Sequence, residues 1–576
     1  MELQVKQISS LEKVRGKEKL DFVEIDKRTV LQGERFSYQL CLASDSQLQA
    51  QLCMESSLTD AVRLYQVKEA VLDCPVTEPG PQEDYLTKDP CLMPDILLPL
   101  ETAAEAIMKN TAFDKNAEPG ENTELVAHTI SITQHFSLTP YITTIWVKVD
   151  IPKDCRPGNY AIRFAIHLYR PGQEPAGVLY KTMRLEVRPV CMPVQKLIYT
   201  RWFYADCIAV AHDVPVYSEA HWNLIEKYIA AAADVGINMI LVPIHTPPLD
   251  TEVGTCRPCV QLVDIEKKGE RYFFSFEKFK RFIDICKRNG ITHFEMAHMF
   301  SQWGAEHAPN IRITENGETV DYFGWHTDAS SEEYVAFLQQ YIPAIEAELT
   351  KEGISENTYF HISDEPTLEN MATYEKASSL IRPLIGNSKT FDALSHYDFY
   401  EKGLVECPVT VVSSLAEFLK HPIENQWAYY CCGPQYVYTN SFMAMPSYRT
   451  RILGFLLYKY DIKGFLHWGF NYYNSCRSWY PVNPYLTTSG DKAYPSGDPF
   501  IVYPGKEEVY PSIRGEVTYE GIQDMQICTL LEAKIGREAV VKRIDEAAGE
   551  PLTFENYPKT KDYLERLRED MIRILE

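Results

Sequence analysis

The sequence lacks clusters of basic residues. Its 57 Lys and Arg stand against 80 Asp and Glu, so the formal net charge is −23. Nucleic-acid binding needs basic patches that neutralise phosphates, and the composition therefore predicts no nucleic-acid partner. The N-terminus M-E-L-Q-V-K-Q-I-S-S has no apolar run typical of a signal peptide, and no stretch reaches the length of a membrane span. We expect a cytoplasmic protein with no membrane span.

Metal-binding motifs are also missing. The spacings His-x-His and His-Glu-x-x-His do not occur, and the 15 Cys are scattered and odd in number. Such cysteines are typical of reduced thiols rather than of a disulfide framework. Cys256 and Cys259 have the spacing of a metal or redox pair, but no second pair at zinc-finger spacing accompanies them. The sequence predicts no metal and no cofactor, and it does not indicate the oligomeric state.

Aromatic residues, in contrast, are plentiful, with 36 Tyr and 8 Trp among 576 residues. Rings of this kind stack on the apolar faces of sugars, and they also fill ordinary hydrophobic cores. The length predicts two or three domains, because a single barrel can exceed 250 residues.

Residues 1–192 show short alternating runs separated by Pro and Gly turns, which predict a β-sandwich domain. From residue 193 the pattern changes to strand, loop and helix in repetition, and R-P-V-C-M-P-V-Q-K forms the linker. Eight such units predict a (β/α)₈ TIM barrel over 193–500, with a doubly wound sheet as the structural alternative. Residues 501–576 include a tail rich in Glu and Lys with a helical pattern, which predicts a C-terminal helical extension packed on the barrel. The eight candidate strands are Leu197–Tyr204, Asn238–Pro243, Thr292–Ala297, Tyr359–Ser363, Thr390–Ala393, Val409–Ser413, Trp427–Cys431 and Gly464–Trp468. The clearest helices are expected at 220–235, 276–289, 332–349, 369–385 and 448–460.

Active sites of such barrels lie at the carboxyl ends of the strands, so the residues that follow each strand are the candidates. The fourth strand lies within T-Y-F-H-I-S-D-E-P and is followed by two adjacent carboxylates, Asp364 and Glu365. Other candidates after the third, fifth and eighth strands are His298, Trp303, Asp392, Tyr397, Trp468, Asn471 and Tyr473. Carboxylates, imidazoles, amides and rings on one rim favour a glycan substrate. The same S-D-E-P motif is equally typical of a helix N-terminus, in which Ser363 or Asp364 caps the helix and Pro366 opens it.

Two acids held at different pKa values are the usual equipment of a glycosidase. A common arrangement places the acid after strand four and a Glu nucleophile after strand seven, but strand seven here ends in C-C-G-P without a carboxylate. Asp392 is one alternative nucleophile. In the other alternative, Asp364 and Glu365 form a pair, and the 2-acetamido group of the substrate supplies the nucleophile. For that chemistry we expect burial and the neighbouring charge to raise the pKa of Glu365.

The sequence resembles glycoside hydrolase family 123, the N-acetyl-β-galactosaminidases. The motifs that resemble the family are T-R-W-F-Y-A-D, G-I-N-M-I-L-V-P-I-H-T-P-P-L-D, H-I-S-D-E-P, F-L-H-W-G-F-N-Y-Y-N, D-P-F-I-V-Y-P-G and P-S-I-R-G-E. The resemblance implies an exo-acting, retaining and substrate-assisted hydrolase that releases terminal β-linked N-acetylgalactosamine from glycosphingolipid-type glycans. It implies that Asp364 orients the acetamido group and that Glu365 is the acid/base.

The remaining rim residues could contact the sugar or only support the loops. Trp303, Trp468 and Tyr473 could form a wall around the acetamido methyl, and His298, Asp392, Tyr397 and Asn471 could bond hydroxyls. A glycosidase for another sugar, such as a β-N-acetylglucosaminide, and a non-catalytic glycan-binding protein on the same scaffold remain open. The β-sandwich could bind glycan or support the barrel.

Overall fold

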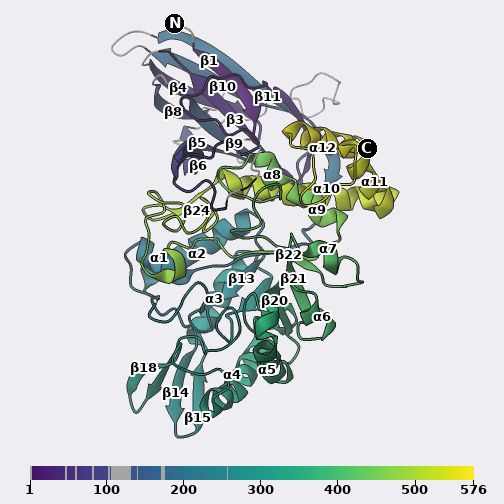
Figure 1. The fold of residues 1–576 in the computed structure, drawn as a ribbon. Coiled ribbons are helices and arrows are strands. Elements are labelled where there is room, and N and C mark those ends of the chain that lie inside the picture. The colour runs from purple at the N-terminus through teal and green to yellow at the C-terminus, as the bar shows by residue number, and fades with distance from the viewer. Residues whose placement is uncertain are drawn as a thin grey trace.

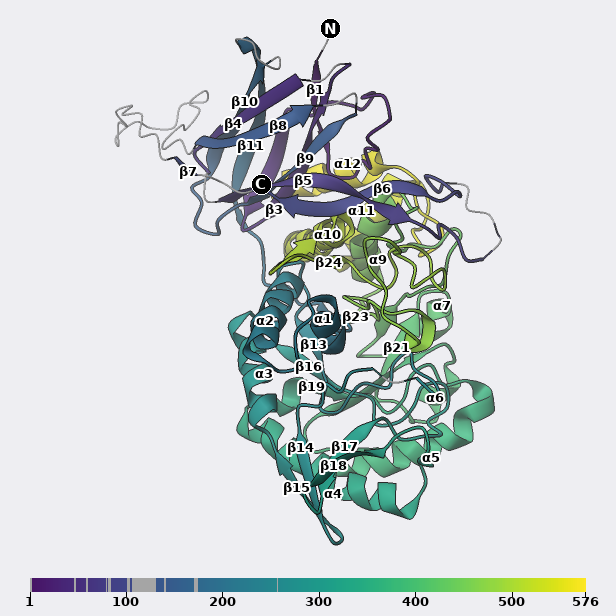
Figure 2. The ribbon, with the colours of Figure 1, turned by 90° about the vertical axis from the view of Figure 1, so that its left-hand side faces the viewer.

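The computed structural model describes residues 3–45, 48–58, 61–78, 80, 84–100, 104–105, 131–138, 141–169, 175–255 and 257–575. A β-rich N-terminal part, an eight-stranded barrel and a group of C-terminal helices follow one another along the chain (Figures 1 and 2). None of the described helices combines the length and the apolar character that crossing a bilayer requires.

The N-terminal part consists of two facing sheets, as the alternating runs predict. Their inner faces share one hydrophobic core, in which Leu40 and Val147 of one sheet meet Leu52 and Phe164 of the other. The five-stranded sheet has the order β1 (Gln4–Ser9), β3 (Arg35–Ala43), β9 (Thr143–Asp150), β5 (Val62–Leu72) and β6 (Cys91–Pro99). The six-stranded sheet has the order β2 (Lys27–Gln32), β11 (Pro175–Cys191), β10 (Gly158–Tyr169), β4 (Leu48–Ser56), β8 (Ser131–Leu138) and β7 (Ala104–Glu105).

Eight parallel strands close into a barrel, which confirms the TIM-barrel prediction and excludes the doubly wound sheet. Closure is made by the first and last strands, which pair from Ile198 with Gly464 to Arg201 with His467. Every barrel strand holds three to six residues, so most are shorter than the ranges expected from the sequence. In order they are β12 (Ile198–Arg201), β13 (Met239–Val242), β16 (His293–Met296), β19 (Thr358–Phe360), β20 (Lys389–Leu394), β21 (Cys407–Val411), β22 (Trp427–Tyr429) and β23 (Gly464–His467).

Helices separate the strands where the amphipathic patterns placed them. The fifth and sixth connections hold only one helical turn each, and the segment 448–460 is divided into two helices. The helices are α1 (Ala205–Ala211), α2 (Glu219–Asp234), α3 (Glu277–Arg288), α4 (Glu332–Lys351), α5 (Met371–Ile381), α6 (Asp398–Glu401), α7 (Leu415–Phe418), α8 (Ser447–Arg451) and α9 (Leu453–Lys459). Short 3₁₀ turns occur at η2 (Ser355–Asn357), η3 (Leu368–Asn370), η4 (Arg382–Leu384) and η5 (Cys476–Ser478).

A four-stranded sheet grows from the loops after the second and third barrel strands, and the sequence analysis did not predict it. Its strands bury few residues, so their alternation is weak; β15, for example, buries only Tyr272. The order is β15 (Arg271–Ser275), β14 (Asp264–Lys268), β17 (Ile311–Glu315) and β18 (Glu318–Phe323). This sheet lies at the end of the molecule opposite the sandwich (Figure 1).

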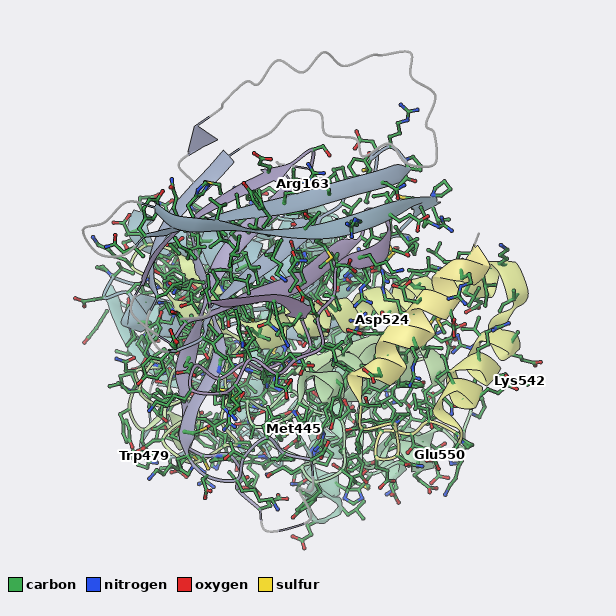
Figure 3. All side chains as sticks on the ribbon, turned by 90° about the horizontal axis from the view of Figure 1, so that it is seen from above. Arg163, Met445, Trp479, Asp524, Lys542 and Glu550 are labelled. Atoms are coloured by element: carbon green, nitrogen blue, oxygen red, sulfur yellow. The ribbon has the colours of Figure 1, made fainter. Side chains whose placement is uncertain are left out.

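The C-terminal segment forms a hairpin, β24 (Val502–Pro504) with β25 (Val509–Pro511), and the helices α10 (Ile513–Ile535), α11 (Arg537–Ala548) and α12 (Lys561–Leu575). Helix α10 does not pack on the barrel alone but lies between the barrel and the sandwich (Figures 1 and 2). Buried ion pairs explain this position, because Glu516 of α10 meets Lys148 of the sandwich at 2.9 Å and Arg514 meets Asp95 at 2.9 Å. Helix α12 contacts the sandwich through Arg28–Glu565 and Glu34–Arg568, whereas α11, which carries Lys542, lies at the outer edge of the molecule (Figure 3).

Candidate active site

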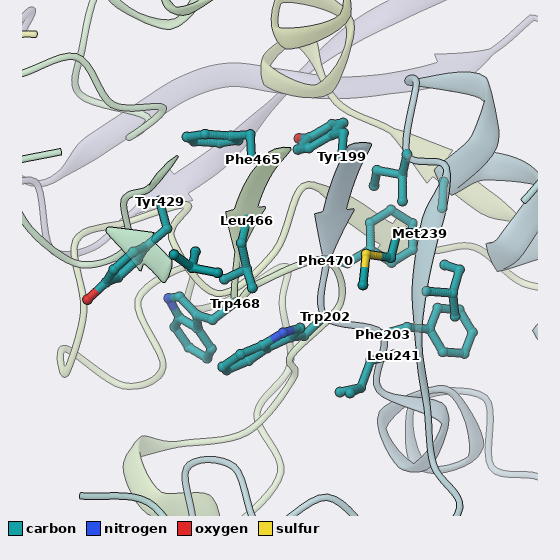
Figure 4. Packing of buried hydrophobic residues seen from close by; sticks show 14 of the residues in the cluster. Tyr199, Trp202, Phe203, Met239, Leu241, Tyr429, Phe465, Leu466, Trp468 and Phe470 are labelled. Carbon is teal, nitrogen blue, oxygen red and sulfur yellow. The ribbon is translucent and has the colours of Figure 1, made fainter. Parts of the chain in front are cut away.

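A cavity with an empty volume of about 570 Å³ opens at the carboxyl ends of the barrel strands. Trp202 and Trp468 lie just beyond the ends of β12 and β23, and Tyr429 is the last residue of β22 (Figure 4). Such a cavity offers aromatic walls and a few polar groups, which is the usual character of a small-molecule site. It is lined by Trp202, Tyr204, Leu249, Asp250, Gln302, Trp303, Asp364, Glu365, Ala393, Tyr429, Cys431, Cys432, Leu466, Trp468 and Tyr494.

Asp364 and Glu365 follow β19 in an irregular segment, not at the start of a helix. The next helical turn, η3, is capped by Thr367, whose side chain forms a capping box with Asn370. The helix-cap interpretation of S-D-E-P is therefore wrong, because the cap lies three residues after Asp364. Glu365 has a positive φ of 44°, a backbone conformation that is uncommon for a residue with a side chain. The surrounding structure holds this strained residue at the site, as is often seen for functional residues.

Each carboxylate accepts a hydrogen bond from a different wall of the cavity. Gln302 Nε2 donates to Asp364 Oδ2 at 2.8 Å, and the Tyr429 hydroxyl donates to Glu365 Oε1 at 2.7 Å. The amide of Gln302 is fixed in this orientation, because its Oε1 accepts a hydrogen bond from the backbone N–H of Asp250 at 2.5 Å. A flip of the amide would break both hydrogen bonds. The two acids are thus held by partners on opposite sides, although they are neighbours in the chain.

Burial changes the protonation behaviour of Asp364. Asp364 is only 5% exposed, and its burial together with the nearby charge of Glu365 raises the pKa of Asp364 to about 8. We expected the raised pKa at Glu365, but the more buried carboxyl of the pair is Asp364. Asp364 therefore retains its proton near neutral pH.

A buried cluster of charges is centred on His361, which lies three residues before Asp364 in the chain. His361 contacts Glu295 at 3.0 Å and Asp392 at 3.2 Å, and all three side chains are fully buried. Burial lowers the pKa of His361, but its hydrogen bonds to Asp392 and Glu295 outweigh that effect and raise the pKa to about 9. An imidazolium between two carboxylates therefore ties β16, the end of β19 and β20 together beneath the cavity.

The structure brings four of the nine predicted site residues to the cavity: Asp364, Glu365, Trp303 and Trp468. Trp303 is 44% exposed at the mouth, whereas Trp468 is buried and donates from Nε1 to Asp498 Oδ2 at 2.7 Å. The site roles of all nine remain predictions, and the other five lie away from the cavity lining.

These five residues have structural partners. Asp392 binds His361 and the backbone N–H of Ile362, and His298 stacks on His361 with 3.8 Å between the ring centroids. The remaining three support loops: Asn471 exchanges two hydrogen bonds with the backbone of Tyr204, Tyr473 donates to the carbonyl of Val502, and Tyr397 stacks on His421.

Several lining residues were not among the candidates. Gln302 lies one position before Trp303 in the loop after β16, and Tyr429 ends strand seven, so both stand on the rim where the barrel rule would look. Asp250 lies eight residues beyond β13, in a loop whose path the sequence does not reveal. Asp250 Oδ2 accepts from the hydroxyls of Tyr472 and Tyr494 at 2.5 and 2.6 Å.

Within the part of the chain that the structure describes, no group of three or more His, Cys, Asp or Glu residues could hold a metal ion. Cys256 lies outside the described residues, so its pairing with Cys259 stays untested.

A closed (β/α)₈ barrel whose carboxyl rim presents two hydrogen-bonded acids in an aromatic cavity is the architecture of a glycoside hydrolase. The chain matches the model of the glycoside hydrolase 123 catalytic domain over residues 202–531, and it belongs to that family. The match ends within α10, and the domain boundaries at 192 and 500 stay predictions.

Among solved structures, a family 123 glycoside hydrolase from Clostridium perfringens, studied for glycolipid glycan hydrolysis, has a TM-score of 0.70 and 14% identity. The match covers 100% of this chain and 99% of that chain, so the fold extends to the sandwich and the C-terminal helices. AggA, a major fimbrial subunit from Escherichia coli, matches with a TM-score of 0.15 and 11% identity over 33% of this chain and 97% of its own. The comparison with curated protein sequences returned no match.

Proposed function

We propose that the protein is an exo-acting, retaining β-N-acetylgalactosaminidase that uses the 2-acetamido group of its substrate as the nucleophile. The observation that supports this most is the pair Asp364 and Glu365, held side by side with separate hydrogen-bond partners. Asp250 is the other carboxylate that lines the cavity, and two tyrosine hydroxyls already occupy its Oδ2. The cavity lining formed by the described residues therefore offers no unoccupied third carboxylate as an enzymic nucleophile, which favours a nucleophile on the substrate.

In the proposed reaction, Asp364 binds the acetamide N–H of the substrate through Oδ1. Gln302 occupies Oδ2, and among the described residues none donates to Oδ1. A donor from the substrate favours the ionised form of Asp364, so the proton of the pair is left on Glu365. Ionised Asp364 then stabilises the positive charge that develops as the acetamide oxygen attacks the anomeric carbon.

Glu365 acts as the general acid and then as the general base. It gives its proton to the glycosidic oxygen as the bond to the anomeric carbon breaks, and the leaving alcohol departs. It then takes a proton from water, whose oxygen attacks the anomeric carbon and opens the oxazolinium ring. Two inversions at this carbon leave its configuration unchanged. The hydrogen bond from Tyr429 holds Oε1 of Glu365 in one direction throughout.

The choice of N-acetylgalactosamine rests on the family, and the relative described for glycolipid glycan hydrolysis favours a glycolipid-type glycan as the source. Hydrolysis of aryl β-glycosides of N-acetylgalactosamine, N-acetylglucosamine and galactose tests both the sugar and the mechanism. We expect turnover of the acetamido sugars and none of plain galactoside. Release from the galactoside alone would contradict substrate assistance. A preference for the N-acetylglucosaminide would show that N-acetylglucosamine, not N-acetylgalactosamine, is the sugar that the enzyme releases.

Substitution of each acid separates their roles. Glu365→Gln should lower kcat most for substrates with poor leaving groups, because the acid is lost. Asp364→Asn should lower kcat for every leaving group. Binding of glycans without any turnover by the wild-type protein would favour a glycan-binding protein on the same scaffold instead.

A further inference from the structure

A group of exposed side chains stands at the mouth of the cavity, where loops after strands two, three and eight meet. We call it the aromatic ledge, and it consists of Glu252, Trp303, Arg477 and Trp479. Trp303 is 44% exposed and Trp479 is 56% exposed, and Trp303 also lines the cavity. Seen from above the sandwich, Trp479 lies at the periphery of the molecule (Figure 3). The ledge thus continues the cavity lining outward to the surface.

Polar contacts hold these exposed rings in one arrangement. Trp479 donates from Nε1 to Glu252 Oε1 at 2.9 Å, and Arg477 forms an ion pair with the other oxygen of Glu252. The guanidinium carbon of Arg477 lies 5.6 Å from the centre of the Trp303 ring. A surface tryptophan with a single rotamer loses little entropy on binding, so a ring held in this way is prepared for a ligand.

The ledge is also connected to the proposed acids. The backbone N–H of Arg477 donates to Asp250 Oδ2 at 3.1 Å, and Ser478 Oγ donates to the Asp250 carbonyl at 2.9 Å. Asp250 in turn holds Gln302, which donates to Asp364. The position of the ledge relative to the acids is therefore set by a continuous chain of hydrogen bonds.

Backbone strain accompanies these contacts. Trp303, Arg477 and Ser478 have φ values of 58°, 52° and 58°, in the left-handed region that favours glycine. Such a residue is strained and persists only where its surroundings fix it. The strain is concentrated at the segments that present the two rings and the guanidinium.

From these observations we propose that the aromatic ledge binds the neutral sugar residues on the leaving-group side of the cleaved bond. This inference rests on the proposed function, in which the cavity holds the terminal sugar and the rest of the bound glycan extends out through the mouth of the cavity. Rings stack on the apolar faces of pyranoses. Asp250, Glu252, Asp364 and Glu365 make this region acidic, and Arg477, the cation of the ledge, is paired with Glu252, so anionic sugars are disfavoured.

Kinetics of Trp479→Ala on two substrates test the ledge. One substrate is a methyl or aryl β-N-acetylgalactosaminide. The other is a free oligosaccharide, without lipid, of three or more neutral sugars that carries β-linked N-acetylgalactosamine at its non-reducing end. We expect kcat/KM to fall roughly three- to tenfold for the oligosaccharide, the size expected for one stacking contact, and to stay unchanged for the small glycoside. Trp479→Tyr, which keeps a ring, should recover most of the loss. Phe273→Ala is the matched control, since Phe273 is 50% exposed on β15 and does not line the cavity.

Three results would overturn the ledge as a sugar site. These are an equal loss on both substrates, no loss on either, or a loss confined to a lipid-linked form of the same oligosaccharide, which would make a lipid the occupant. A binding measurement separates this proposal from the catalytic one. Titration of Glu365→Gln with the oligosaccharide, with and without Trp479→Ala, should show weaker binding in the double variant even if the wild-type protein hydrolyses none of the glycosides.

Discussion

Two neutral donors, the phenol of Tyr429 and the amide of Gln302, determine how the adjacent acids are presented. Neighbouring residues in an extended chain usually point to opposite sides. The positive φ of Glu365 and the separate partners let both carboxylates line one cavity. This arrangement suits chemistry in which one carboxylate stabilises charge and the other transfers a proton.

Removal of the Tyr429 hydroxyl tests this arrangement. In Tyr429→Phe the loss of a hydrogen bond to a charged group, about 1.5–3 kcal/mol, should lower kcat by roughly ten- to a hundredfold. Steady-state kinetics on the aryl glycoside measure the effect. Tyr430→Phe is the control, because Tyr430 packs on Phe465 and His467 and does not line the cavity. Equal losses in both variants would indicate a packing defect instead.

Asp364 also makes the stability of the protein depend on pH. Its pKa is about 8 when folded against 3.8 in an exposed chain, so the folded state binds the proton more tightly. The contribution of this group is fully present below pH 3.8 and is lost as the pH rises through 8. Asp364→Asn should therefore be more stable than the wild type at pH 8 and should differ least near pH 4.

Urea unfolding at several pH values measures this difference directly. Asp498 and Glu520 have pKa values raised to about 7 by burial and add the same trend, but they are present in both proteins and cancel in the comparison. A constant difference between pH 4 and 8 would show that Asp364 does not retain a proton when folded.

Among the elements, the neighbouring strands β16, β19 and β20 are linked by the cluster of Glu295, His361 and Asp392. Asp392 accepts the N–H groups of Ile362 and Ser363 and the hydroxyl of Tyr374. It holds the segment that leads to Asp364, without reaching the cavity lining. This geometry favours a positioning role for Asp392 over that of a nucleophile.

The two roles of Asp392 predict different responses to Asp392→Ala. A buried imidazolium that loses one partner should destabilise the fold by about 3–5 kcal/mol. Activity should fall with it, and added azide or formate should not restore it, because no nucleophile has been removed. Rescue by azide, with an inverted azide product, would instead identify Asp392 as the nucleophile.

Much of the element pattern could be predicted from the sequence, because barrel strands are buried runs separated by strongly amphipathic helices such as α3. The four-stranded sheet escaped prediction because its strands are largely exposed. At the site, the position of the two acids followed from the strand rule, but their partners did not. Gln302 and Tyr429 meet the acids from a loop after β16 and from the end of β22, through side-chain directions that the sequence does not give. Asn471 and Tyr473 turn toward backbone groups that the sequence cannot place.

Across the whole molecule, the sandwich contacts the loop that carries part of the cavity lining. Asp73, next to β5, accepts hydrogen bonds from Thr487 and Ser489 at 2.5 Å each, and from Ser496 at 3.1 Å. These residues belong to the loop after β23, which also carries Trp468 and Tyr494. The contacts agree with the expectation that the sandwich supports the barrel.

Loss of this support should be visible in catalysis. In Asp73→Ala the loop after β23 loses its anchor, and kcat/KM should fall, by up to about a hundredfold if a lining residue moves by about 1 Å. Asp89→Ala is the control, since Asp89 is exposed near the same edge of the sandwich. Full activity of Asp73→Ala would show that the loop is held by the barrel alone.

The anchoring by Asp73 has a consequence for how such a gene can be recombined. A chimera that joins this barrel to a foreign sandwich would leave several loop hydroxyls without their acceptor and would bury Glu516 without Lys148. Productive crossover points should therefore lie outside the interdependent segments, and the sandwich and barrel should be inherited together as one unit.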